Sequence, residues 1–99
     1  MDSIQLKKFG VAITQKGIAD DIYNQIKALS PQTTEIVVDM SGVVAMTTQC
    51  ANIIFGKLYR ELGSDLYFQN IKVENATKAI QFVIDMGLDH AIKTARNTR

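Results

Sequence analysis

The chain has very few of the residues that build metal centres and disulfide frameworks. Its 99 residues include one cysteine, one histidine, one proline and no tryptophan. A zinc site needs several His, Cys or carboxylate ligands at close spacing, whereas Cys50 and His90 lie far apart on different predicted elements. A lone cysteine forms no internal disulfide, so we expect Cys50 to be an inert core residue. We therefore expect no metal site, no cofactor and no catalytic residues.

Strong net charge and long apolar runs are also lacking. The 11 basic and 10 acidic residues leave a formal net charge of +1. A field this weak does not favour nucleic acid or an anionic membrane as the main partner. No apolar run approaches the roughly 20 residues of a membrane span, and the N-terminal segment MDSIQLKKFG lacks the basic-then-apolar pattern of a signal peptide. We expect a cytoplasmic protein that does not act at a membrane.

The first half of the chain alternates strand and helix patterns. Loose alternation over residues 3–11 predicts an edge strand, or a short hairpin broken at Gly10. Residues 16–29 carry one helical stripe, which ends at Ser30-Pro31 and consists of Ile18, Ile22, Ile26 and Leu29. The β-branched run within residues 35–40 predicts a strand that is covered by helices on both faces.

The second half continues the alternation. Asp39, Ser41 and Gly42 mark a turn, and a long helix then ends at Gly63, its apolar stripe consisting of Ala51, Ile54, Phe55, Leu58 and Leu62. Residues 66–73 alternate like a strand, and Asn75 is expected to cap a final helix. The tail, residues 89–99, is expected to extend that helix and then fray. Strands alternating with helices predict an α/β domain with a mostly parallel sheet.

Two adjacent threonines, Thr47 and Thr48, open the long helix. One hydroxyl is expected to cap the helix by accepting a backbone amide hydrogen, which typically contributes about 1 kcal/mol. The other hydroxyl is then free for a partner protein or a kinase. A phosphate there would place negative charge at the positive end of the helix dipole. Capping is the simpler explanation of the pair, and the two roles do not exclude each other.

The segment around these threonines resembles the STAS fold, shared by anti-sigma factor antagonists and the cytoplasmic domains of sulfate transporters. It resembles the bacterial STAS-like family of small uncharacterised proteins still more closely. The similarity is confined to residues 37–63 and rests on the stretches VVDMSGV, MTT, AN and FGKL. The resemblance implies a single STAS-like domain over residues 1–99, with a mostly parallel, mixed sheet of about four to five strands and three to four helices.

The resemblance also implies a phosphorylation site. In the antagonists, an aspartate is followed by a serine that a partner kinase phosphorylates, then by a second serine and a glycine. The matching positions here are Thr47, Thr48, Gln49 and Cys50. Thr48 keeps a hydroxyl at the phosphoacceptor position, whereas the other three positions differ from the family pattern. Thr48, and after it Thr47, are therefore the candidate phosphoacceptors.

These observations favour a non-enzymatic regulatory module that binds another protein. The resemblance implies a histidine-kinase-like ATPase or another regulatory protein as the partner. Met46, just before the threonines, is expected to be an exposed contact. The candidate partner interface consists of Asp39, Ser41, Gly42, Met46, Thr47, Thr48, Gln49 and Asn52.

A sensor of small molecules or nucleotides is the alternative. The free amides at the start of the helix would bind an anionic group, which predicts a pocket beside residues 42–49.

Overall fold

Two small parallel sheets organise the protein. A computed structural model describes residues 2–97 of the chain, with side chains as far as residue 94. The central sheet has the order β1-β3-β5, from β1 (Asp2–Gln5), β3 (Ile36–Asp39) and β5 (Ile71–Glu74). A second parallel pair joins β2 (Ala12–Ile13) to β4 (Ala45–Met46). Five strands, all paired in parallel within the described residues, confirm the α/β fold and the mostly parallel sheet.

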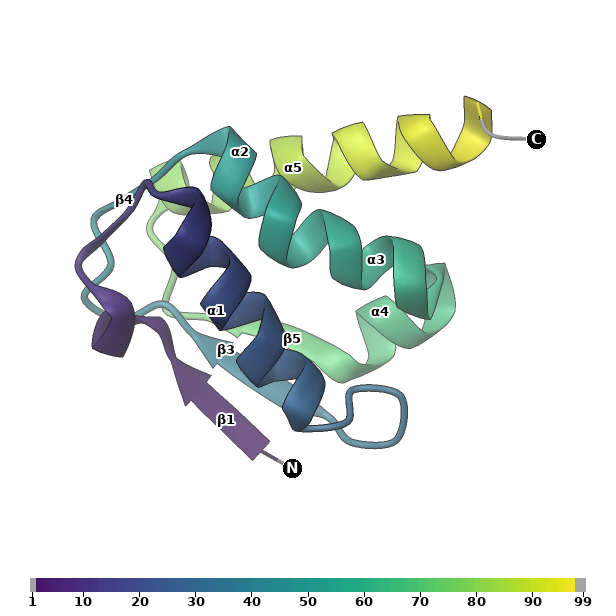
Figure 1. Ribbon diagram of the computed structural model, residues 1–99, viewed down its shortest axis with the longest axis horizontal. Coiled ribbons are helices and arrows are strands. Elements are labelled where there is room, and N and C mark those ends of the chain that lie inside the picture. Colours follow the sequence, from purple (N-terminus) through teal and green to yellow (C-terminus); the bar gives the residue numbers. More distant parts are fainter. Residues whose placement is uncertain (1, 98–99) are drawn as a thin grey trace.

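The helices cover one face of the central sheet, as Figure 1 shows. In register across the sheet, Ile4, Val38 and Val73 form one row and Ser3, Val37 and Lys72 the next. The row with Ile4 and Val38 is turned into the core, whereas Ser3 and Lys72 are exposed. The expectation that helices cover β3 on both faces is therefore wrong. Every second residue of β3 lies on the face of the sheet that meets solvent. The β-branched run therefore belongs to a strand that helices cover on one face only.

The long helix after the threonines is continuous but changes its winding. It consists of α2 (Thr48–Ala51), the π-helical turn η2 (Asn52–Gly56) and α3 (Lys57–Leu62). Gly63, with φ of 84°, ends it as predicted, because its N–H donates to the Tyr59 carbonyl at 2.9 Å. The helix stripe lies in the core, and Cys50 is fully buried there. The expected burial of Cys50 is thus confirmed.

The first helix is also confirmed, whereas the N-terminal segment differs from the expected hairpin. The helix is α1 (Lys16–Ala28). β1 is an edge strand, but it is followed by a 3-10 turn, η1 (Leu6–Phe9), and by Gly10 with φ of 130°. β2 then pairs with β4 and not with β1. A hairpin over residues 3–11 is therefore wrong, because the chain leaves the sheet instead of turning back along it.

The predicted strand over residues 66–73 is largely wrong. The structure has a helix, α4 (Ser64–Asn70), which leads directly into β5. Tyr67 and Asn70, three residues apart, are both buried. The Tyr67 ring packs edge-on against Tyr59 at 5.8 Å, and the Asn70 amide donates to the Pro31 carbonyl at 2.7 Å. Tertiary contacts at helical spacing thus override an alternating pattern of aromatic residues.

The last helix, α5 (Lys78–Asn97), confirms the expected extension into the tail. The expected fraying beyond it lies outside the described residues. Its cap is Thr77, whose hydroxyl accepts the Ile80 N–H at 3.1 Å, and not Asn75 as predicted. Asn75 adopts a left-handed conformation with φ of 62° and donates instead to Asp39. Asparagine tolerates this conformation better than most residues, which explains its position before the helix.

Helix α5 crosses the α2–η2 segment at very short range. A Cβ placed on Gly87 would lie 2.9 Å from both the Ala51 carbonyl carbon and the Asn52 nitrogen. A Cβ on Gly56 would collide with the Asn52 side-chain oxygen and lie 3.4 Å from the Gly87 carbonyl. Glycine at both positions lets the two helices approach backbone to backbone. We call this contact the glycine crossing.

Substitution at the glycine crossing tests this packing. Gly87→Ala is expected to lower the free energy of unfolding by about 1–3 kcal/mol, because the added methyl group forces the helices apart. Gly17→Ala is the matched control, since a Cβ there meets nothing within 4 Å, and it should leave stability unchanged or raise it by about 0.5 kcal/mol. Urea denaturation measures both. Equal effects of the two substitutions would contradict the crossing.

A polar cluster joins α1 to α3 on the surface. Glu61 accepts hydrogen bonds from the Tyr23 hydroxyl and, at 3.1 Å, from the Lys27 ammonium group. The Tyr23 hydrogen bond is the main cause that lowers the Glu61 pKa below its usual value of 4.5, and Lys27 and Lys57 lower it further, against the opposing effect of burial. Burial and Glu61 together raise the Tyr23 pKa to about 12.

The cluster predicts a dependence of stability on pH. Because folding lowers the Glu61 pKa, its contribution is present above about pH 4.5 and is lost as the pH falls through the folded-state pKa. The Glu61→Gln variant should therefore lose less of its free energy of unfolding than wild type below that pH. Asp21→Asn, at an exposed position on α1, is the control. Parallel acid profiles for wild type and Glu61→Gln would show that the cluster contributes nothing.

Candidate functional site

The two threonines have different surroundings. The Thr47 hydroxyl accepts the Cys50 N–H at 3.1 Å and caps the helix, while its own N–H donates to the Ile13 carbonyl at 3.1 Å. Thr47 is half-buried between β2 and the core. Thr48 is exposed at the first helical residue. Thr47 is therefore the cap, and Thr48 is the hydroxyl that a partner can reach. A phosphoacceptor role for either residue stays a prediction.

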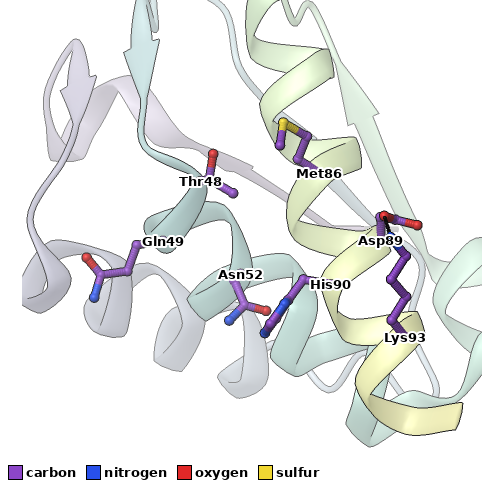
Figure 2. A pocket seen from close by; sticks show the side chains of 7 residues that line it. All are labelled: Thr48, Gln49, Asn52, Met86, Asp89, His90 and Lys93. Atoms are coloured by element: carbon purple, nitrogen blue, oxygen red, sulfur yellow. Dashed lines mark ion pairs between the residues drawn. The ribbon is translucent and has the colours of Figure 1, made fainter. Parts of the chain in front are cut away.

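Thr48 lines a cavity between the start of α2 and the middle of α5, shown in Figure 2. Its volume is about 380 Å³. Gln49 and Asn52 line the same side as Thr48, and the α5 side is lined by Met86, Asp89, His90 and Lys93. The sensor hypothesis predicts a pocket beside residues 42–49, and this cavity meets that stretch only at its end.

Charged side chains line the α5 wall of the cavity, and Asn52 lines the opposite wall. Lys93 and Asp89 form an exposed ion pair at 3.1 Å within α5, which offsets much of the charge that Lys93 brings. The Asn52 side-chain oxygen is buried and has no hydrogen-bond partner among the described residues. Leaving such an acceptor unpaired costs about 1–3 kcal/mol. It lies at the first residue of the π-helical turn, and π-turns occur frequently at functional sites.

The other part of the predicted interface lies elsewhere, at the end of β3. Asp39 accepts the Ser41 N–H at 2.9 Å and the Asn75 amide at 3.0 Å. The Asn75 hydrogen bond, followed by that of Ser41, holds the pKa of Asp39 below its usual value. Gly42, with φ of 83°, passes directly beneath the Lys7 side chain. A separate hollow of about 260 Å³ is lined by Gln5, Lys7, Asp39 and Ser41.

The structure thus divides the predicted interface into two groups. Asp39, Ser41 and Gly42 form a turn tied to the end of β5, whereas Thr48, Gln49 and Asn52 border the α5 cavity. The two cavities that these groups line share no residue. The turn organises the ends of two strands, and the α2 group provides the accessible hydroxyl.

Met46 is not the exposed contact that the sequence predicts. It is 7% exposed, because it pairs in register with Ile13 and points into the core with it. Val44, two residues earlier, is 69% exposed, and its N–H donates to the Val11 carbonyl at 2.8 Å. Val11 is also exposed. The prediction is wrong because the pairing with β2 places Met46 beside Ile13 in the core, and the two valines are the apolar contacts that it missed.

Helix α5 contributes further residues that sequence reasoning missed. Phe82 is 65% exposed, and Met86 follows one turn later on the same side of the helix. Helix α5 contacts β4, the strand that directly follows Val44. The spacing of Phe82 and Met86, outside the buried stripe of Ile80 and Ile84, is the sequence signal that indicates a second apolar face.

Met86 shares the cavity with the exposed Thr48, and Val44 precedes Thr48 by four residues in the chain. Four of the five large apolar residues that are exposed in the described chain come from the residues just before β2 and β4 and from α5. We call this region the Thr48 surface. It consists of Val11, Val44, Thr48, Gln49, Asn52, Phe82, Met86 and His90.

Comparison with family models identifies the family of this chain. The family model of the STAS-like domain of unknown function (DUF4325) matches residues 9–81. The chain belongs to this family. The match covers α1, the long helix and β5, and it ends early in α5. Met86 and His90, on the α5 side of the cavity, therefore lie beyond the matched segment.

Comparison with curated proteins and with solved structures gave no significant match. The STAS-like assignment therefore gives the family without a specific activity. Within the described residues, no three His, Cys, Asp or Glu side chains gather as a candidate metal centre. None of the helices in that part of the chain has the length and apolar character needed to cross a bilayer.

The separate roles of the threonines can be tested by stability. Thr47→Ala is expected to lower the free energy of unfolding by about 1 kcal/mol, because the Cys50 N–H loses its partner. Thr48→Ala, the matched control on the adjacent residue, should change it by less than about 0.5 kcal/mol. Thermal and urea denaturation measure both variants. A larger loss for Thr48→Ala would show that the cap is misassigned.

Proposed function

We propose that this STAS-like domain is a non-enzymatic regulatory module that binds another protein through the Thr48 surface. The observation that carries the proposal is that the exposed Thr48 shares a cavity with the exposed Met86, while Val44 and Phe82 are exposed before β4 and on α5, two elements in contact. Val44 and Phe82 are largely exposed although each loses favourable burial by being so. Exposed apolar residues that gather in one region of a small domain are typical of interaction surfaces.

The arrangement fits the anatomy of a protein interface. Apolar anchors such as Val44, Phe82 and Met86 would supply burial, and the polar groups of Gln49, Asn52 and His90 would supply hydrogen bonds at the rim. Asn52 adds a polar side chain to the wall of the cavity. The proposed partner is a histidine-kinase-like ATPase or another regulatory protein in the cytoplasm.

Phosphorylation of Thr48 is the proposed switch. A phosphate would add negative charge beside the exposed apolar residues, where burying it in an interface costs desolvation. Thr47 would keep the helix capped in both states, because its hydroxyl is already engaged with the Cys50 N–H. The switch therefore acts on binding and leaves the fold intact.

Small-molecule sensing remains a second candidate, favoured by the cavity itself. Its 380 Å³ volume lies within the usual range for ligand pockets. His90 and Lys93 line it, together with the amide of Asn52. An anionic ligand would contact these groups and would not need the exposed valines of the Thr48 surface.

A pull-down from the native host, read by quantitative mass spectrometry, tests the proposal. We expect wild type to retain an ATPase or regulatory protein, and Thr48→Glu and Val44→Asp each to reduce its recovery about tenfold or more. Ser64→Glu is the matched control. It makes the same kind of change at the first residue of α4, which lies on the opposite side of the molecule from α2 (Figure 1).

Retention of the same proteins by wild type, Thr48→Glu and Val44→Asp would contradict the proposal. If no protein is retained by wild type, thermal shift with inorganic phosphate and with nucleotides tests the sensor candidate. A rise in melting temperature that His90→Ala abolishes would then support ligand binding. Circular dichroism of each variant confirms that the fold is unchanged.

A further inference from the structure

The outer edge of β5 is an open strand edge. β5 is the last strand in the order β1-β3-β5, and no strand pairs with its other side within residues 2–97. The Met40 N–H donates to the Glu74 carbonyl at 2.8 Å, so the backbone groups of Glu74 point towards β3. Successive residues of a strand point their backbone groups to opposite sides. The N–H and carbonyl of Val73 therefore point to the open edge.

A groove follows this edge between the sheet and α5. Its volume is about 570 Å³, and its lining includes all four residues of β5, α4 residues Tyr67 and Phe68, and α5 residues Ile84 and Leu88. Phe68 is 54% exposed on α4, immediately before β5. An open edge beside apolar side chains is a template for another strand. In Figure 1, β5 and α4 lie away from α2 and β4, which carry the Thr48 surface.

We propose that a second copy of this chain pairs with β5 in antiparallel orientation, forming a symmetric dimer with one continuous six-stranded sheet. The charges of β5 favour this occupant. Around a two-fold axis at Val73, the two Val73 residues exchange both backbone hydrogen bonds. Lys72 of each copy then lies opposite Glu74 of the other. Both side chains are exposed on the open face of the sheet, where opposite charges across strands stabilise pairing.

The other edge strand, β1, lacks this complementarity. The Asp2 N–H donates to the Glu35 carbonyl at 3.0 Å, so Ser3 points its backbone groups to the free edge. A two-fold axis at Ser3 places Asp2 opposite Ile4, and no charges are paired. The geometry therefore selects β5. This inference goes beyond the proposed function, since the dimer leaves the Thr48 surface of each copy available.

Sedimentation equilibrium over a concentration series from micromolar to near-millimolar tests the dimer. The expected result is a mass that rises from 11.0 kDa towards twice that value. Lys72→Glu and Glu74→Lys each place like charges opposite one another and should weaken the dimer about tenfold. The double variant Lys72→Glu/Glu74→Lys restores opposite charges and should recover the wild-type dissociation constant.

Two further variants make the test specific. Val73→Pro removes an N–H that points to the open edge and is not used in the pairing with β3. Proline is tolerated at such positions of edge strands, so the fold should be kept while the dimer is abolished. Lys8→Glu is the matched control. It makes the same charge reversal as Lys72→Glu at an exposed residue of η1 and should leave the dimer unchanged. A monomer at every concentration, or a dimer insensitive to both single charge reversals, would overturn the proposal. Thr48→Glu should still dimerise, so failure of partner binding and failure of the dimer are distinguishable.

Discussion

The glycine crossing between α5 and the α2–η2 segment determines both surfaces of this protein. Gly87 lies against the backbone of Ala51 and Asn52, at a distance that leaves no room for a Cβ. This contact fixes the height of α5 above the sheet and its rotation about its own axis. It thereby brings Met86 and His90 to the cavity beside Thr48. On the opposite side of the same helix, Ile84 and Leu88 line the groove along β5.

The elements with a strong apolar period could be predicted from the sequence. The stripes of α1 and of the long helix, the β-branched run of β3 and the stop at Gly63 gave the correct elements, because local pattern and tertiary packing agree there. Residues 66–73 failed because Tyr67 and Asn70 are fixed by contacts from distant segments. The coverage of β3 on both faces also failed, since a four-residue strand cannot show which side its partners occupy.

The candidate site was predicted only in part. The Thr47-Thr48 pair follows from capping chemistry, which is local, and the structure separates the cap from the exposed hydroxyl. Burial of Met46 depends on the pairing of a two-residue strand with β2, which no local pattern specifies, and the exposed Val44 lies just before that strand. The contribution of α5 was missed for a related reason. Helix packing decides which long-range neighbours share a cavity, and the crossing at Gly87 has no distinct local signal.

The glycine crossing can be observed directly in solution. Nuclear Overhauser spectroscopy of the isotope-labelled chain measures the proximity of the Ala51 methyl group to the Gly87 α-protons. The structure predicts an intense cross-peak, since a Cβ on Gly87 would lie 3.0 Å from that methyl carbon. Absence of the cross-peak, in a spectrum that shows the other core contacts of Ala51, would contradict the account. It would mean that α5 is held differently and that neither surface exists in the form described.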